Sequence, residues 1–381
     1  MSGTKKSIPI FLAFLAMGFN DAVGPLSSQL QNDYNLSNTA AGLVPFMGLI
    51  MFGLLSIPLG IYQDRKGKKY ILQLGLIAAL LGLILPIIGS FSTFTLILAA
   101  LLLLGTGATM LQVAGNPIMR DVSPEGLYSR NLSYAQFVKA IGSLSASLIP
   151  IIAVKYWGLD WKILFPIYSV IVLIIIIYLY VTKIEETEDT ASPPASFAST
   201  FSLMKIPFIA LMVIGIFLYV GAEVSMSAKL PNYLQARFDF DIKELGLWGT
   251  LFLFLAIMTG RFLGGVILNW LSPRTFLIVS AIISLIGFAV LYLAPVVIVG
   301  FIAIVLIGLG FANIFPLIFS ITVDHMPERS NEISGLMVTA IIGGAIVPLA
   351  FGVVADVFSL MAGFIVPLVC IVYILFIAFK K

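Results

Sequence analysis

Long apolar stretches separated by short polar segments follow one another along almost the whole chain. A helix that crosses the hydrocarbon core of a bilayer needs about 20 such residues. The strict alternation of apolar and polar positions that is typical of membrane-spanning strands is absent from these stretches. The pattern predicts an all-α membrane protein with twelve transmembrane helices, at roughly 7–31, 38–62, 70–90, 92–119, 130–154, 161–183, 205–231, 246–270, 276–294, 296–322, 331–356 and 359–379.

Composition narrows the possible functions. Charged residues make up 10% of the 381 residues, compared with about 25% in soluble domains, and the net charge of +3 gives no reason to expect nucleic acid as a partner. Because the chain has one cysteine, Cys370, and one histidine, His325, we expect no disulfide, no metal centre and no cofactor. The sequence also lacks a phosphate-binding GxxxxGK[ST] loop and a catalytic constellation, so we expect a protein that is not an enzyme.

Lysine and arginine residues concentrate in alternate loops. If both termini are cytoplasmic, fourteen of these residues lie inside and four outside. This distribution matches the excess of basic residues on the cytoplasmic side of membrane proteins. We therefore expect an integral protein of a bacterial inner (plasma) membrane with both termini in the cytoplasm.

One long polar segment divides the twelve predicted helices into six and six. It reads "KIEETEDTASPPASFAST" from Lys183 onward, a composition typical of a flexible linker. The halves also repeat, because Asp21 is matched by Glu223 and "DVSPE" at 121–125 by "DHMPE" at 324–328, at offsets of 202 and 203 residues. We expect two parallel six-helix repeats, with an N-terminal bundle at 1–183, a cytoplasmic linker at 184–204 and a C-terminal bundle at 205–381.

The loop after the second predicted helix reads "GIYQDRKGKKY" from residue 60. It resembles the G-x-x-x-D-R-x-G-R/K-R/K loop of the major facilitator superfamily. The resemblance implies a conformational latch formed by Gly60, Asp64, Arg65 and Gly67, in which glycine allows close contact between helices. The second half has Asn269 in place of the acid, so we expect a weaker latch there.

Further segments resemble the fucose–proton symporter family within that superfamily. They are "NDAVGP" at 20–25, "LQVAGNP" at 111–117, "YVGAEVSMSAKLPNYL" at 219–234, and "FANIFPLIFSI" at 311–321 with "GGAIVP" at 343–348. The resemblance covers essentially the whole chain. It implies the major facilitator fold, with sugars as substrates and, in most members, protons as coupling ions.

Two positions depart from the pattern of this family. Gln112 stands where the fucose carriers have an acid, and Lys139, in "QFVK", stands where the family has Asn. Loss of an acid and gain of a base change the charge of the membrane interior by two units. Fucose specificity therefore cannot be carried over to this chain.

Asp21 lies near the middle of the first predicted helix, where an ionised carboxylate is costly. A low dielectric disfavours its charged form, and a proton-coupled carrier needs a carboxylate that gains and loses a proton. The resemblance implies the same role, because the corresponding Asp is a proton site in the family. A structural role is the alternative, since the adjacent Gly24 and Pro25 free backbone groups that a carboxylate can cap.

Lys139 is nine residues into the fifth predicted helix, too deep for its ammonium to reach water easily. Three roles are open for it: a counterion of Asp21, a ligand for an anionic substrate such as a sugar acid, and a structural base paired with backbone carbonyls. Glu223 is a candidate for substrate or coupling contact and equally for packing between the halves. We expect Arg261 to pair with a carboxylate in the latch, toward the cytoplasmic end of the eighth helix.

Neutral amides suit the hydroxyl groups of a sugar, each of which donates and accepts a hydrogen bond. Asn116 and Asn313 also lie near Pro117 and Pro316, and satisfying freed backbone groups is their structural alternative. Trp248 is a candidate for stacking on a sugar or for the membrane interface. The candidate substrate-binding residues are Asn20, Gln112, Asn116, Gln136, Glu223, Asn232, Trp248 and Asn313.

These observations predict a monomeric secondary transporter that couples a monosaccharide to protons by alternating access, with the halves rocking about a central site. Asp21 and Lys139 are the candidates for proton coupling. Three alternatives stay open: a carrier of an anionic solute bound by Lys139, a sodium-coupled sugar carrier, and a membrane sugar sensor that does not transport.

Overall fold

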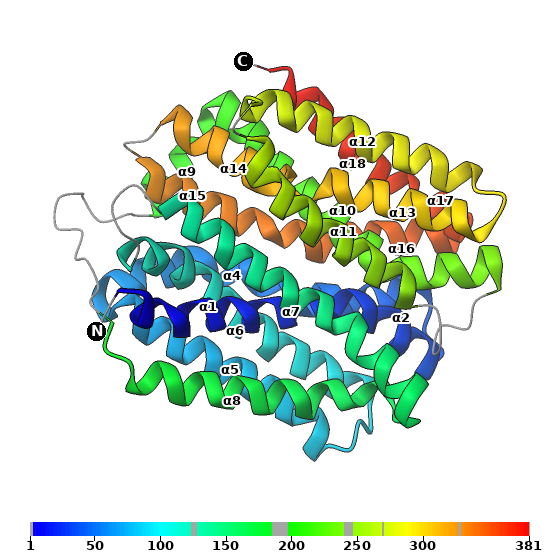
Figure 1. The fold of residues 1–381 in the computed structure, drawn as a ribbon, viewed down its shortest axis with the longest axis horizontal. Helices are drawn as coiled ribbons and strands as arrows, with labels where there is room; N and C mark the ends of the chain where they lie inside the picture. The colour runs from blue at the N-terminus through cyan, green and yellow to red at the C-terminus, as the bar shows by residue number, and fades with distance from the viewer. Residues whose placement is uncertain are drawn as a thin grey trace.

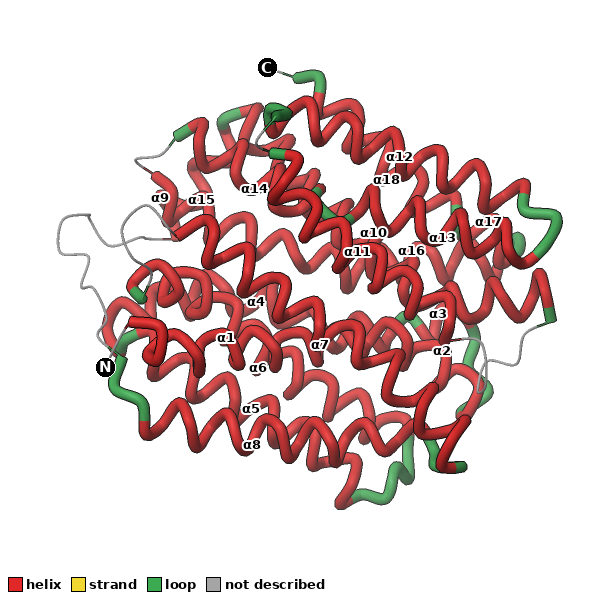
Figure 2. The backbone as a smooth tube through the Cα atoms, in the orientation of Figure 1, coloured by secondary structure: helices red, strands yellow, loops and turns green. Residues whose placement is uncertain are grey.

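The computed structural model describes residues 3–122, 128–184, 197–239, 247–268, 270–326 and 329–380. Every regular element within these ranges is a helix (Figure 2). Twelve helical stretches of the described residues are long and apolar enough to cross a membrane. The predicted number of spans and the all-α class are therefore confirmed.

The helices of the first half lie together along one side of the molecule and those of the second half along the other (Figure 1). The first half contains α1 (Gly3–Phe19), η1 (Asn20–Ala22), α2 (Val23–Asp33), α3 (Asn38–Ala41), α4 (Leu43–Lys66), α5 (Lys68–Ile88), α6 (Phe94–Asp121), α7 (Tyr128–Trp157), η2 (Trp161–Ile163) and α8 (Leu164–Val181).

The second half follows the predicted linker, of which residues 185–196 lie outside the described residues, so the predicted domain boundaries stay a prediction. Its elements are α9 (Phe197–Ser202), η3 (Leu203–Lys205), α10 (Pro207–Phe238), α11 (Leu247–Ile267), α12 (Pro273–Leu293), α13 (Val297–Phe311), α14 (Ile314–His325), α15 (Ser330–Thr339), η6 (Ala340–Ile342), α16 (Gly343–Val357), α17 (Leu360–Gly363) and α18 (Ile365–Ala378).

Three spans are interrupted near their middles. The first changes to a 3₁₀ turn at Asn20–Ala22, the tenth breaks between α13 and α14, and the eleventh changes at Ala340–Ile342. Proline explains the break in the tenth span, because the ring of Pro316 excludes the carbonyl of Ala312, four residues earlier, from helical hydrogen bonding. Such breaks are tolerated within a membrane where the backbone lines a cavity or finds other partners.

Helices α1 and α7 touch backbone to backbone. A Cβ atom on Gly18 would overlap the carbonyl oxygen of Lys139, and one on Gly142 would overlap the carbonyl oxygen of Leu15. Small residues at such contacts let membrane helices approach closely. The contact brings the start of the break in the first span against the middle of α7.

A polar network joins the two halves at the end of the molecule where α2, α3 and the second part of α10 meet. Ser28 Oγ donates to the carbonyl oxygen of Ala228 at 2.5 Å and lies 2.8 Å from Asn232 Oδ1. Lys229 Nζ donates to Gln31 Oε1 at 3.0 Å. We call Ser28, Gln31, Asn38, Lys229 and Asn232 the α2–α10 network.

Candidate functional site

A cavity lies between the two halves, beside the breaks in the first and eleventh spans. Its volume is about 80 Å³, several times the roughly 10–15 Å³ that one bound water needs. The lining combines aromatic side chains, Phe52, Phe254 and Phe315, with charged and amide groups. A cavity of this composition is typical of a site for a small molecule.

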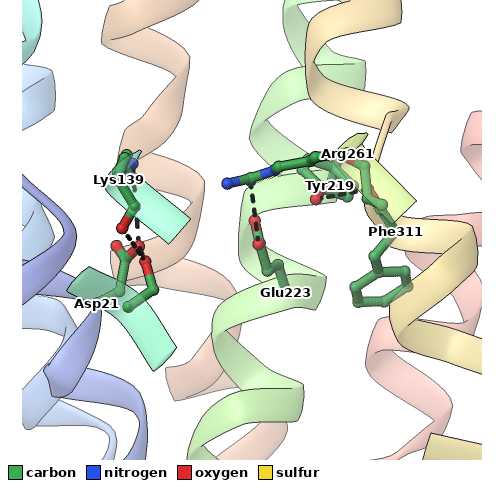
Figure 3. Close-up of polar contacts among 8 residues, drawn as sticks. Asp21, Lys139, Tyr219, Glu223, Arg261 and Phe311 are labelled. Carbon is green, nitrogen blue, oxygen red and sulfur yellow. Dashed lines mark hydrogen bonds and ion pairs between the residues drawn. The ribbon is translucent and has the colours of Figure 1, made fainter. Parts of the chain in front are cut away.

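An acid and a base from the first half face this cavity (Figure 3). Asp21 comes from the 3₁₀ turn of the first span, and its Oδ2 accepts a hydrogen bond of 2.5 Å from Ser143 Oγ on α7. Lys139, one turn earlier on α7, places its Nζ 4.0 Å from the same oxygen. The two charges therefore attract each other at a distance longer than a hydrogen bond.

A second acid and base come from the other half (Figure 3). Glu223 on α10 places Oε1 3.8 Å from Nη2 of Arg261 on α11. The guanidinium of Arg261 also donates from Nε to the carbonyl oxygen of Ala312 at 3.4 Å, the group that Pro316 excludes from the helix. The adjacent carbonyl of Phe311 accepts a hydrogen bond of 2.9 Å from Tyr219. The break in the tenth span is thus held by donors from α10 and α11.

Seven of the residues expected from the sequence line this one cavity. Asn20 is 2% exposed, and its Oδ1 has no hydrogen-bond partner among the described residues, so a bound polar group would satisfy it. Gln112 is buried and Gln136 is half-buried in the same cavity lining. The seven are Asn20, Asp21, Gln112, Gln136, Lys139, Glu223 and Arg261.

Four expected substrate ligands lie elsewhere. Asn313 donates from Nδ2 to the carbonyl oxygen of Gly260 on α11 at 2.8 Å, which is a contact between spans and not a bond to the carbonyl that Pro316 frees. Asn232 belongs to the α2–α10 network, and the ring of Trp248 lies against Phe252 with centroids 6.1 Å apart. Asn116 does not line the cavity either. Trp248 Nε1 is buried and has no hydrogen-bond partner among the described residues, and substrate contact by these four residues stays a prediction.

The loop expected to form a latch is described only in part. Gly67 joins α4 to α5 with a φ of +89°, a conformation that glycine adopts readily. Among the described residues, no atom of a neighbouring segment lies within 4 Å of a Cβ built on Gly60. The side chains of Asp64 and Arg65 lie outside the described ones, as does Asn269. Arg261, which we expected to pair with a carboxylate in the latch, lines the cavity and has Glu223 as its carboxylate neighbour; its role in a latch stays a prediction.

Sequence reasoning missed two polar residues that the structure places at important contacts. Ser143, which bonds Asp21, lies four residues after Lys139, so helical spacing alone puts it on the same face. Lys229 is 1% exposed inside the seventh span, and its depth in an apolar stretch was the signal for a special role.

Comparison with known proteins identifies the family. The family model of the Major Facilitator Superfamily matches residues 10–348. The chain belongs to the major facilitator superfamily. Its relatives are carriers, which confirms the expectation that it is not an enzyme. Because twelve helices of the described residues are long and apolar enough to cross a membrane, it is an integral membrane protein.

Relatives and solved structures agree with this assignment. The chain is 29% identical to a glucose/galactose transporter of Brucella abortus, over 96% of the chain and 91% of the relative. It is 26% identical to the L-fucose-proton symporter of Escherichia coli, over 91% of this chain and 85% of the relative. A crystal structure of the Escherichia coli fucose–proton symporter superposes with a TM-score of 0.72 at 22% identity, covering 99% of this chain and 97% of that one. The inward-facing structure of a bacterial homologue of the human lysosomal transporter Spinster superposes with a TM-score of 0.75 at 15% identity. The match covers 99% of this chain and 95% of that one.

Proposed function

We propose that this chain is a monosaccharide–proton symporter that works by alternating access. The observation that carries the proposal is the cavity between the halves, where two acid–base pairs and three amide side chains meet. A site between two repeats is where carriers of this architecture bind their substrates. Relatives named glucose/galactose transporter and L-fucose-proton symporter support a sugar as the substrate.

The charges of the lining favour a neutral substrate. Asp21 and Glu223 contribute two negative charges, and Lys139 and Arg261 contribute two positive ones, so the sum is zero. Each base has an acid within 4.0 Å, so an anionic substrate would compete with a carboxylate for it. Amides such as Asn20, Gln112 and Gln136 instead match hydroxyl groups, which donate and accept.

Asp21 is the candidate for the proton site. It is the acid that lies at a broken helix, half-buried in the cavity, with its charge balanced by Lys139 at 4.0 Å. Protonation of Asp21 would release Lys139 from this attraction and reorganise the site for sugar binding. Return of the empty carrier would then require loss of the proton on the cytoplasmic side.

One observation favours a second candidate, a carrier of an anionic solute. The Nζ atom of Lys139 lies beyond hydrogen-bond distance of Asp21, so its N–H groups are available to a sugar acid. A charge-assisted contact of that kind would contribute about 1.5–3 kcal/mol. The same uptake experiment distinguishes this candidate from the first.

The test is uptake by the purified chain in proteoliposomes. Radiolabelled glucose, galactose, fucose and the matching sugar acids are offered with an inward proton gradient, an inward sodium gradient, or neither. We expect a neutral sugar to accumulate with the proton gradient alone. Accumulation driven by the sodium gradient would show that sodium, not the proton, is the coupling ion. Accumulation of sugar acids only would favour the second candidate, and binding without transport would indicate a sensor.

The orientation and the assembly of the carrier belong to the same proposal. We infer cytoplasmic termini from the distribution of basic residues, which places the α2–α10 network at the outer end of the cavity. Cysteine labelling of residues in the loops would test this orientation from both sides of the membrane. We infer that the carrier is a monomer because one chain contains both halves of the cavity.

A further inference from the structure

Ser143 lies on α7, one turn beyond Lys139, and makes the shortest polar contact of Asp21. It is 4% exposed, and its hydroxyl donates to Asp21 Oδ2 at 2.5 Å. The same hydroxyl lies 3.2 Å from the backbone carbonyl oxygen of Lys139. Two acceptors are therefore within reach of one hydroxyl group.

The backbone holds this hydroxyl in place. Gly18 and Gly142 bring α1 and α7 into direct contact, with no room for a Cβ atom on either residue. The contact is three residues from Asp21 on one helix and one residue from Ser143 on the other. The hydroxyl thus stays near the carboxyl group whichever way its hydrogen points.

We propose that Ser143 is a positioning residue that serves Asp21 in both of its protonation states, an inference that rests on the proposed proton-coupled function. A hydroxyl donates to an ionised carboxylate and accepts from a protonated one. When Asp21 gains a proton, Ser143 turns its own hydrogen to the carbonyl of Lys139. The ammonium of Lys139 only donates, so it serves the ionised state alone.

Several other ionisable groups face Asp21 and remain the same in the test variants. Lys139 lies on α7, Glu223 lies on α10, and Arg261 lies on α11 in the shared cavity. Tyr168 on α8, whose hydroxyl is 2.7 Å from Ser145 Oγ, also lies within electrostatic reach. Loss of the Ser143 hydroxyl removes its hydrogen bond to both forms of Asp21. The bond to the ionised carboxylate is the stronger one because it is charge-assisted, so proton-driven uptake should shift toward higher pH.

The experiment measures proton-driven uptake of radiolabelled glucose, or of the sugar that the panel identifies, as a function of pH. We expect Ser143→Ala to shift the profile alkaline by about one pH unit, and Ser143→Thr to restore it to within a few tenths. Ser147→Ala is the matched control: Ser147 is buried one turn further along α7, and its hydroxyl has no hydrogen-bond partner among the described residues.

The outcomes separate the two proposals. Absence of proton-driven uptake in the unaltered protein would refute the proposed function itself. Proton-driven uptake with the same pH profile for Ser143→Ala and the unaltered protein would overturn only the role of Ser143, as would an equal shift in Ser147→Ala. If Ser143→Ala is inactive in transport, the pH dependence of glucose binding in detergent gives the same comparison.

A separate observation concerns Lys229, the buried lysine of the α2–α10 network. Its Nζ donates to Gln31 Oε1 at 3.0 Å and lies 3.5 Å from Asn38 Oδ1. Asn38 in turn donates from Nδ2 to Asp356 Oδ1 at 2.7 Å. Lys229 and Asp356 belong to the second half and Asn38 and Gln31 to the first, so these contacts break when the halves separate at this end.

The two amide oxygens that Lys229 approaches have other donors. Gln31 Oε1 also accepts from Asn232 Nδ2 at 3.4 Å, and Asn38 Oδ1 accepts from Gln31 Nε2 at 3.2 Å. Removing the lysine would leave neither oxygen unsatisfied. Asp356 acts on Lys229 only from a distance, because no ion pair of Lys229 within 4.0 Å is present among the described residues. The lysine gives up its hydration on closure, and a buried amine that lacks a direct carboxylate contact is costly whether it stays charged or loses its proton.

We infer that Lys229 weakens the closed outer end and so keeps outward opening accessible. Contact with water when the halves separate restores the hydration of the ammonium. An apolar side chain of similar length would lack this penalty, and replacement of buried charges by apolar groups often stabilises a packed state. Lys229 thus destabilises the closed outer end, whereas the other hydrogen bonds of the α2–α10 network stabilise it.

The test measures the distance between spin labels on Leu159→Cys and Leu293→Cys, two exposed residues at the outer ends of the halves, in a Cys370→Ala background in nanodiscs. We expect Lys229→Met to lower the population with a separated outer end by about fivefold or more, and Lys229→Arg to keep it within about twofold. Lys229→Gln should give an intermediate value, which keeps the test valid if the Met variant does not fold.

The control is Lys155→Met, the same change at an exposed lysine of the outer end of α7, which we expect to leave the population unchanged. A larger separated population in Lys229→Met would show that Lys229 holds the outer end closed, which overturns the inference. An unchanged population would overturn it as well.

Discussion

The two acid–base pairs of the cavity differ in how their bases are held. Arg261 is fixed from two sides, by Glu223 at 3.8 Å and by the backbone carbonyl of Ala312 at 3.4 Å. An arginine side chain stays charged in proteins, and its planar group fits two acceptors at once. Lys139 carries a point charge on a flexible stem, with its Nζ 4.0 Å from Asp21.

The acids differ in a corresponding way. Asp21 lies at a break in its helix and shares Ser143 with the backbone of α7. Glu223 lies within the continuous helix α10. The pair of the first half is therefore held loosely, and we propose that it changes its charge during transport; we call it the changeable pair. The pair of the second half is held from two sides, and we call it the fixed pair. We infer that the changeable pair couples transport to protons and that the fixed pair helps to hold the substrate.

The largest effect is expected from removing the acid of the changeable pair. Asp21→Asn should abolish accumulation of sugar driven by a proton gradient, because the amide cannot take up or release the proton, while exchange of sugar across the membrane persists. Parallel assays of gradient-driven uptake and of counterflow in proteoliposomes measure the two activities. Accumulation at the rate of the unaltered protein would show that another residue carries the coupling, which would refute the difference in role between the two pairs.

A smaller effect is expected from the matched change in the second half. Glu223→Gln leaves the half-buried charge of Arg261 without its carboxylate, which disturbs the site without removing the proton site. We expect affinity for sugar to fall by about tenfold, roughly 1.4 kcal/mol, with accumulation retained at saturating substrate. Loss of coupling in Glu223→Gln but not in Asp21→Asn would reverse the roles of the two pairs.

Much of the fold could be predicted from the sequence because the membrane limits the possibilities. Twelve apolar stretches fix twelve helices, since only helices and closed barrels satisfy the backbone in lipid. The attraction between Asp21 and Lys139 was also expected, because two opposite charges deep in one half have few other partners. The roles of these residues stay predictions.

The finer placement of the polar residues depended on distances along helices that composition does not reveal. Asn232 is nine residues beyond Glu223 on α10, or about 14 Å at 1.5 Å per residue, which puts it in the α2–α10 network. Trp248 is thirteen residues before Arg261, or about 20 Å. An amide or an indole suits a sugar wherever it occurs, so residue type alone could not place them.

The most discriminating change concerns Lys139, on which the class of substrate depends. If Lys139 is the counterion of Asp21, its charge favours the ionised carboxylate, and Lys139→Asn removes this effect. The pH profile of uptake should then shift alkaline by about one unit. Affinity for a neutral sugar should change by less than about threefold, because an amide still bonds hydroxyl groups.

If Lys139 instead binds an anionic substrate, the same variant loses a charge-assisted contact of about 1.5–3 kcal/mol, or roughly ten- to hundredfold in affinity. One titration of Lys139→Asn with glucose and with a sugar acid, across pH, therefore separates the two roles, and Lys155→Asn at the exposed end of α7 serves as the control. A shifted profile with unchanged affinity for glucose supports the division between a changeable and a fixed pair. A collapse of affinity for the sugar acid, with glucose inert in both proteins, would make Lys139 a substrate ligand and leave the proton site without its counterion.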